Sequence, residues 1–317
     1  MALKDMVFKC LKDAAGQQFT ARQLAEMIVE KYPEQASHKK ANSGSNVQTM
    51  LDLIEQFAAE IGSRRPGWQE KNTQLKTTSG RPRKYYWSEH SDEAEVNLSD
   101  SLGLPAKPLA TEQSALPSDP PAIITEHSLY PLLAKYLKSE LDVFSMRIDE
   151  KTSSNKGGMG SNEWLHPDLV GLEDLASDWV DVIKSCVAEL SERRARLWSF
   201  EVKILINRSN VRKSYFQTVS NSSWAHYGYL VAATVEGEDT MRELQMLSAT
   251  HGIGVIQLDV NEPTESQILI PAKERATLDW EMCNRLAEEN KDFTSYLQKI
   301  GDFSKLGKVL PTEWLMK

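Results

Sequence analysis

The chain has 317 residues, of which 40% are hydrophobic and 26% are charged, the composition of a soluble globular protein with room for two domains. It contains no apolar run approaching the ~20 residues needed to cross a membrane, and its start lacks the regions of a signal peptide. Its three cysteines are odd in number and scattered, which argues against a disulfide framework or a zinc cluster. These features exclude a membrane-spanning protein and predict a cytoplasmic one.

Charge is distributed unevenly along the chain, whose formal net charge is −8. Residues 1–90 contain 14 Lys and Arg against 10 Asp and Glu, a net charge of +4. Residues 91–122 are acidic and contain five prolines, a composition typical of a semi-extended linker. The sequence therefore predicts a first domain at 1–90, an acidic Pro-rich linker at 91–122 and a second domain at 123–317.

The first domain is predicted to contain three helices followed by a β-hairpin. Apolar residues at helical spacing indicate helices that begin near Leu3, Thr20 and Asn46, and Thr20 is a suitable N-cap. Two strands are expected at 68–71 and 83–87, because the pattern there changes to aromatic and charged residues. This order of elements is that of a winged helix-turn-helix domain.

Basic side chains lie where a winged helix meets DNA, since its third helix can enter the major groove while the hairpin touches the backbone or minor groove. They precede the third helix, follow it or lie on the hairpin. The residues predicted to contact DNA are Lys39, Lys40, Arg64, Arg65, Arg81, Arg83 and Lys84. A winged helix that binds another protein is the alternative.

The second domain is predicted to begin with a helix at Glu126, followed by three strands, a helix, a strand, a helix and a strand. A Gly-rich loop at 156–163, before the second strand, is expected to be flexible and to face the substrate. Apolar residues on one helical face predict a helix over 175–196, between the second and third strands. One or two closing helices are expected after residue 261.

The third strand, 198–206, carries Glu201 and Lys203 on the face opposite its apolar residues, because side chains alternate along a strand. An ordinary charge pair on a half-solvated strand is the simplest interpretation of this pattern. Asp168, at the start of the preceding strand, suggests a second interpretation of Glu201 and Lys203. An Asp on one strand and Glu-x-Lys on the next can hold a divalent metal and a lysine against a phosphodiester.

Mg²⁺ suits such a site because it prefers oxygen ligands, keeps several waters and lowers the pKa of bound water. Asp168 and Glu201 would be its direct ligands, with the backbone carbonyl of Val202 as a third. Lys203 would lie beside the attacking water and the phosphate, where it could stabilise charge in the transition state. Mn²⁺ is expected to substitute for Mg²⁺.

Residues 126–260, with Pro167-Asp168 and Glu201-Val202-Lys203 on strands of the expected rank, resemble the PD-(D/E)XK nuclease superfamily. The resemblance implies that Gln217, in the helix after the Glu-x-Lys strand, is an active-site residue. It also implies that Glu126 holds a second metal or a metal-bound water. A helix N-terminal Glu stabilised by the macrodipole is an equal alternative for Glu126. The family often joins its second and third strands by a tight hairpin, so the predicted intervening helix leaves the strand register open.

The first domain also resembles the winged helix at the front of some restriction-associated proteins, and the whole chain resembles the HrgA-type restriction-associated proteins of bacteria. Together these resemblances imply an α/β (α+β) protein with a restriction-endonuclease-like mixed sheet behind a winged helix. The implied function is that of a Mg²⁺-dependent DNA endonuclease in restriction or anti-phage defence. Its expected partners are double-stranded DNA, with or without modified bases, and a second copy of the chain. The alternative is a non-catalytic DNA-binding regulator, and RNA stays open as a substrate.

Overall fold

The computed structural model describes residues 1–41, 47–78, 82–102, 104–105, 123–153, 166–190, 192–310 and 314. The described chain divides into two units. The first comprises Met1–Glu95 together with Val235–Met241, and the second comprises Val96–Thr234 together with Arg242–Lys317. The fold is mixed α/β, as the sequence predicts.

The first unit contains the predicted helices and hairpin, with an additional helix, α3, and an additional two-residue strand, β1, that pairs with β3. Its three strands form an antiparallel sheet in the order β1-β3-β2. The elements are α1 (Leu3–Asp13), β1 (Phe19–Thr20), α2 (Ala21–Lys31), α3 (Pro33–Ala41), α4 (Met50–Lys71), β2 (Leu75–Thr77) and β3 (Lys84–Trp87).

The sequence missed one helix of this unit and gave one strand wrongly, although the helix before Pro33 ends where it predicts. Helix α3 starts at Pro33, where the sequence predicts only the end of the preceding helix, because a proline at the first helical position lacks only an N–H that would be unpaired anyway. The predicted strand at 68–71 is the last turn of α4, which begins at a capping box between Thr49 and Asp52 and continues through Pro66. The side chain of Trp68 still packs against the core, where its ring contacts Phe8.

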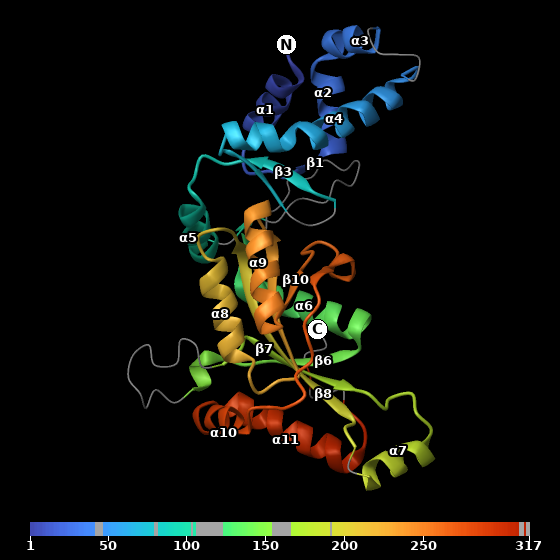
Figure 1. Ribbon diagram of the computed structural model, residues 1–317, viewed down its shortest axis with the longest axis vertical. Coiled ribbons are helices and arrows are strands. Elements are labelled where there is room, and N and C mark those ends of the chain that lie inside the picture. Colours follow the sequence, from blue (N-terminus) through green and yellow to red (C-terminus); the bar gives the residue numbers. More distant parts are fainter. Residues whose placement is uncertain are drawn as a thin grey trace, which may run out of the picture. The chain divides into compact units, whose positions relative to one another are not determined.

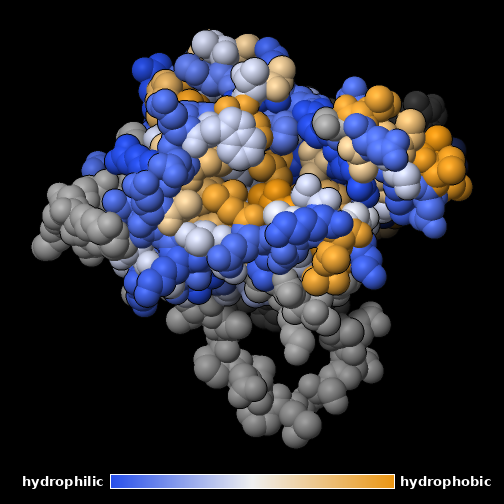
Figure 2. Space-filling model, turned by 90° about the horizontal axis from the view of Figure 1, so that it is seen from below, coloured by the Kyte–Doolittle hydropathy of each residue, from blue (hydrophilic) through white to orange (hydrophobic). Residues whose placement is uncertain are grey.

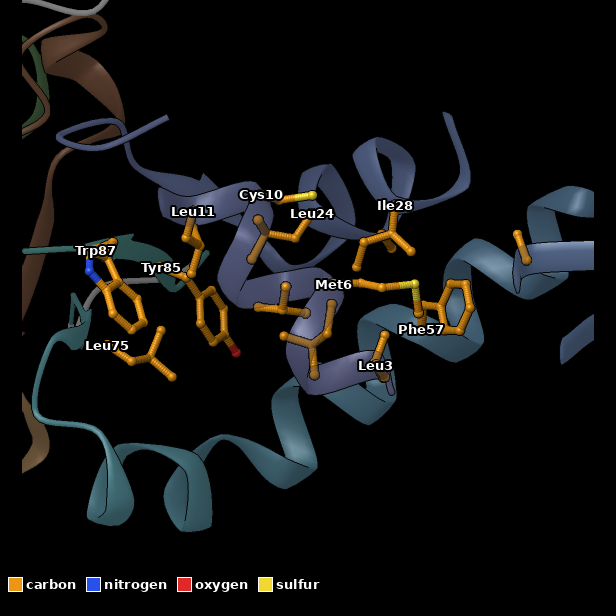
Figure 3. Packing of buried hydrophobic residues seen from close by; sticks show 14 of the residues in the cluster. Leu3, Met6, Cys10, Leu11, Leu24, Ile28, Phe57, Leu75, Tyr85 and Trp87 are labelled. Carbon is orange, nitrogen blue, oxygen red and sulfur yellow. The ribbon is translucent and has the colours of Figure 1, made fainter. Parts of the chain in front are cut away.

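The core of the first unit lies between α1, α2, α4 and the hairpin β2–β3, which we call the wing (Figure 3). Helix α1 contributes Met6 and Leu11, helix α2 contributes Leu24, and helix α4 contributes Phe57, all of them buried. Tyr85 on β3 closes this core from the wing. The helices are therefore held together by their apolar faces. The wing is held against them by the apolar side chains that it buries.

An ion cluster anchors the wing. The ammonium of Lys76 on β2 is buried and lies 2.8 Å from Asp92, 2.7 Å from Glu95 and 3.5 Å from Glu236. Asp92 and Glu95 come from helix α5 (Asp92–Leu102), so the predicted semi-extended linker is helical over these residues. Of the rest of the linker, Leu104–Pro105 forms a two-residue strand, and residues 103 and 106–122 lie outside the described residues. Glu236 is also buried, and its backbone bridges to Thr78 beside β2.

The second unit is built on a six-stranded sheet in the order β11-β10-β9-β8-β7-β6 (Figure 1). Strands β6, β7 and β8 are antiparallel, β9 and β10 are parallel, and β11 is an antiparallel edge strand. The strands are β6 (Val143–Arg147), β7 (Leu169–Asp174), β8 (Ala195–Ile206), β9 (Tyr227–Val235), β10 (Gly254–Gln257) and β11 (Gln267–Ile270), with a separate pair β4 (Leu104–Pro105) and β5 (Ile123–Ile124).

Helices cover both faces of this sheet. Helix α6 packs on the face that carries Trp198, Phe200 and Val202, whereas α10 and α11 pack on the face that carries Leu197. In Figure 1, α10 and α11 lie side by side below the sheet. The helices are α6 (Glu126–Leu141), α7 (Asp181–Glu189), α8 (Val211–Asn221), α9 (Glu238–His251), α10 (Trp280–Glu289) and α11 (Lys291–Leu306).

The pairing of β7 with β8 settles the strand register that the sequence leaves open. The pairs run from Leu169 opposite Phe200 to Asp174 opposite Ala195, so the intervening segment sits at the tip of a hairpin. Helix α7 in that segment is shorter than the predicted helix at 175–196. Residue 168, which precedes β7, therefore lies beside residue 201 on β8. The predicted loop at 156–163 lies outside the described residues.

The Lys76 cluster makes stability depend on pH. Burial raises the pKa of Glu236 from 4.5 to about 8, against the lowering effect of Lys76. The folded state therefore binds this proton more tightly than the unfolded chain, and stability falls as pH rises from 4.5 to about 8. Between pH 5 and pH 8.5 the free energy of unfolding should fall in both proteins. We expect the fall to be smaller in the Glu236→Gln variant than in the wild type, by on the order of 1–3 kcal/mol.

Urea denaturation across this pH range measures the effect. The Glu93→Gln variant, which changes an exposed carboxylate on the same helix as Glu95, serves as the control and should follow the wild-type pH dependence. Parallel curves of stability against pH for the wild type and Glu236→Gln would contradict the assignment.

Candidate active site

The Glu-x-Lys pair on β8 is buried rather than solvated. Glu201 is 1% exposed, and its Oε1 atom accepts a hydrogen bond of 2.7 Å from the ammonium of Lys203. The neighbouring Phe200 and Val202 face α6, so the predicted alternation of faces is confirmed. A half-solvated strand would leave such a pair in water. Burial of the Glu201 carboxylate, with Lys203 only 17% exposed, therefore makes the simplest interpretation of the sequence pattern untenable.

Asp168 meets this pair through the backbone of β8. Its Oδ2 atom accepts a hydrogen bond of 2.7 Å from the N–H of Val202, and its own N–H donates to the carbonyl of Phe200 at 3.1 Å. The N–H and C=O of one residue in a strand point to the same side. The Val202 carbonyl that the sequence nominates as a ligand therefore faces the side of the strand on which Asp168 lies.

Glu126 lies at the same site, in the first turn of α6, after the N-cap Thr125. Its Oε2 atom is 3.8 Å from the Lys203 ammonium. The hydroxyl of Tyr130 lies 3.3 Å from Glu126 Oε1 and 3.2 Å from Asp168 Oδ1. Since a hydroxyl has one proton, it can donate to only one of these carboxylates at a time. Tyr130 thus links the two acidic residues, a role for which the sequence has no motif.

Asn221, at the end of α8, is a second residue that the sequence analysis missed. It is fully buried, and its Nδ2 atom donates to Glu201 Oε2 and to the carbonyl of His166, both at 3.0 Å. The predicted Gln217 is only half-buried and lies one helical turn earlier on α8. The helical period could have suggested Asn221, because residues four apart share a face.

Burial dominates the electrostatics of the site. It raises the pKa of Glu201 to about 8, with a further contribution from Asp168 and opposition from Lys203. It also raises the pKa of Glu126 to about 7, again against the effect of Lys203. Burial lowers the pKa of Lys203, but the carboxylates of Glu201, Asp168 and Glu126 outweigh it and raise that pKa above its usual range. Three carboxyls around one ammonium therefore favour a proton or a second cation.

The carboxylates near Lys203 are less compact than another acidic group of the described chain. Across the described ranges, one set of three acidic residues has ligand oxygens all within 4.8 Å of one another, namely Asp92, Glu95 and Glu236 in the first unit. The ammonium of Lys76 already lies within 3.5 Å of all three of these carboxylates. The three carboxylates at the Glu201 site are spread more widely than this limit.

The predicted DNA-contacting residues fall into separate groups in the first unit. Lys39 and Arg64 both bind Glu60, at 2.9 Å and 3.2 Å, on the rim of a cavity of about 580 Å³ between α1, α3 and α4. The guanidinium of Arg65 is buried and binds Glu238 at 2.6 Å, so it is not presented to a ligand.

The remaining basic residues lie on the wing and on α3. Arg83, which is half-buried, lies 3.5 Å from Glu238, and Lys84 begins β3. Lys40 is in the last turn of α3, and Arg81 lies outside the described residues. The described residues among those predicted to contact DNA therefore lie on α3, on α4 and on the wing.

Comparison with known proteins adds no family: no family model matches the chain, and no curated protein or solved structure is significantly similar to it. Among the described residues, no helix is both long and apolar enough to span a membrane. The function is therefore inferred from the geometry of the site.

The hydrogen bond from Asn221 to Glu201 should contribute to the stability of the protein. In the Asn221→Ala variant, a buried carboxylate oxygen loses its hydrogen-bond donor, and we expect the protein to lose about 2–3 kcal/mol of stability. The Gln217→Ala variant, one turn away on the same helix, should change stability by less than about 0.5 kcal/mol. Urea denaturation followed by circular dichroism compares the two, and equal losses would rule out the proposed support of Glu201.

Proposed function

We propose that the second unit is a Mg²⁺-dependent DNA endonuclease of the PD-(D/E)XK type. The observation that carries the proposal is the register of β7 and β8, which sets Asp168 beside a Glu-x-Lys pair that is buried at its glutamate. Keeping two charges inside a sheet costs free energy and is unusual without a functional reason. The resemblance in the sequence motifs points to the same chemistry.

The donor set suits Mg²⁺. Three carboxylates and a backbone carbonyl supply only oxygen ligands, which this ion prefers over nitrogen or sulfur. Asp168, Glu201 and the Val202 carbonyl would hold it, with Glu126 as a further ligand or as the acceptor of a metal-bound water. When bound, Mg²⁺ would polarise the phosphate and lower the pKa of a water molecule.

The residues of the chain have distinct roles in this proposal. Lys203, whose ammonium lies 2.7 Å from Glu201, would contact a phosphate oxygen, where it would stabilise the charge of the transition state. Asn221 orients the Glu201 carboxylate from the helix side, and Tyr130 orients Asp168 and Glu126 from α6.

In this proposal the first unit selects the DNA. Its basic residues on the wing and on α3 would contact the phosphate backbone of double-stranded DNA, with or without modified bases, and deliver it to the nuclease unit. A cytoplasmic role in restriction or anti-phage defence, and cleavage by a homodimer, are part of the same proposal.

One observation favours a second candidate function. Lys203 already neutralises Glu201 at 2.7 Å, and the carboxylates are not arranged for a metal in the structure. A non-catalytic DNA-binding regulator with a nuclease-like scaffold would keep this ion pair as a permanent structural element. The two functions differ in whether Glu201 binds a metal.

Cleavage of a supercoiled plasmid with Mg²⁺ or Mn²⁺ tests the catalytic proposal. We expect the Asp168→Asn and Lys203→Met variants to lose at least about 100-fold in rate, because each removes a group that acts on the phosphate or its metal. The Glu140→Gln variant changes an exposed carboxylate on α6 and should cleave at the wild-type rate.

Calorimetric titration with Mn²⁺ separates the two functions without relying on activity. The wild type should bind the ion and the Glu201→Gln variant should not. Folded protein that neither binds Mn²⁺ nor cleaves DNA would favour the regulator.

Binding of a short DNA duplex at a series of salt concentrations tests the role of the wing. The logarithm of the affinity should fall linearly with the logarithm of the salt concentration, and each lost phosphate contact should reduce that slope by about 1. We expect Lys84→Ala to reduce the slope in this way and Lys4→Ala, on α1, to leave it unchanged. Identical slopes for both variants would remove the wing from the interface.

A further inference from the structure

The acidic helix α5 ends beside the candidate active site. Its 11 residues, Asp92–Leu102, include four acidic residues and no basic one. After α5, strand β4 (Leu104–Pro105) pairs with β5 (Ile123–Ile124), and Thr125, which follows β5 directly, is the N-cap of α6. Because paired residues of neighbouring strands lie about 5 Å apart, the end of α5 is held near the start of α6, the helix that carries Glu126.

The carboxylate of Asp100, in the last turn of α5, belongs to the charges of this site. Ser99 beside it is buried, so this turn of the helix is held by packing. Partial burial raises the pKa of Asp100, although the ammoniums of Lys203 and Lys213 act in the opposite direction. Burial chiefly raises the pKa of Glu126 as well, and the charge of Asp100 contributes to that rise. Asp100 therefore lies within electrostatic reach of two lysines and one carboxylate of the site.

Helix α8 brings the second of these lysines, Lys213, to the same side of the sheet. Asn221, at the end of α8, donates a hydrogen bond of 3.0 Å to Glu201. Residues four apart share a helical face, so Gln217 and Lys213 precede Asn221 on that face, and Lys213 lies about 12 Å from it along the axis. In Figure 1, α5 lies beside the upper end of α8. Lys213 and the end of α5 therefore meet near the candidate active site.

We propose that Lys203 and Lys213 form a binding position for a DNA phosphate, and that Asp100 occupies this position in the absence of DNA. The inference rests on the proposed function, which supplies the identity of the ligand. A carboxylate and a phosphodiester each carry one negative charge, and both accept charge-assisted hydrogen bonds from ammonium groups. The end of α5 is thus a competitor built into the chain, and its covalent attachment keeps its effective concentration high. DNA must displace it before a phosphate reaches Lys203.

Binding of a short DNA duplex without divalent metal ions tests this competition apart from cleavage. The Asp100→Asn variant lacks the competing charge and should bind the duplex at least about 5-fold more tightly than the wild type. Two controls make the same charge change elsewhere and should alter the affinity by less than about 2-fold. Glu93→Gln changes an exposed carboxylate two turns earlier on α5, and Asp181→Asn changes an exposed one on α7, which lies in the lobe on the right of Figure 2.

A variant of Lys213 assigns the effect to this position rather than to charge in general. Lys213→Gln should weaken binding of the duplex. Adding Asp100→Asn to it should improve the affinity by less than about 2-fold, because the lysine for which carboxylate and phosphate compete is gone. An equal gain of affinity in both backgrounds would overturn the proposal, as would equal affinities of Asp100→Asn and Glu93→Gln. Both substituted side chains are exposed, so the variants should fold, which circular dichroism checks.

Plasmid cleavage with Mg²⁺ distinguishes this inference from the proposed function. Asp100→Asn should lower KM at least about 5-fold and leave kcat unchanged, because Asp100 opposes binding and takes no part in the chemical step. If no protein cleaves DNA but Asp100→Asn binds it more tightly when Lys213 is present, the nuclease proposal fails and the phosphate position stands. If the wild type cleaves and Asp100→Asn has the same KM, the nuclease proposal stands and the phosphate position fails. A chain that binds no duplex in any variant would overturn both.

Discussion

The antiparallel register of β7 and β8 is the constraint on which the candidate site depends. A shift by one residue would move every side chain of a strand to the opposite face, so that Glu201 and Lys203 would exchange places with Phe200 and Val202. The apolar face against α6 prevents that shift. The hydrophobic pattern of β8 therefore holds the charged residues in position, although they take no part in that packing.

Both units place a lysine inside a group of carboxylates. Lys76 joins helix α5 and residue Glu236 to the wing, and Lys203 lies among Glu126, Asp168 and Glu201. Buried ion pairs contribute little net stability, because desolvation offsets most of the attraction, but removing one partner is costly. The two lysines differ in how accessible they are to a ligand. Lys76 has contacts with three carboxylates, whereas Lys203 lies at the rim of its group, where an incoming phosphate can compete.

Periodicity in the sequence was enough to predict most elements of the second unit and the faces of β8, because those depend on local side-chain alternation. Periodicity predicted the wrong structure where contacts between residues far apart in the sequence determine it. The end of α4 at 68–71 follows its packing against α1 and overrides Pro66, and β11 is an edge strand with an exposed, non-alternating pattern. The predicted acidic and lysine residues do converge, but Tyr130 and Asn221 approach them only through the tertiary fold.

The discontinuity of the first unit limits how it can be separated from the rest of the chain. A fragment ending at residue 90 would keep β2 and β3 but would lose all three carboxylates around Lys76 and the Glu238 partner of Arg65. Two buried cations would then be left without counter-charges, at a cost of several kcal/mol. The first unit is formed from two separate segments of the sequence, so cutting the chain at one point cannot release it intact.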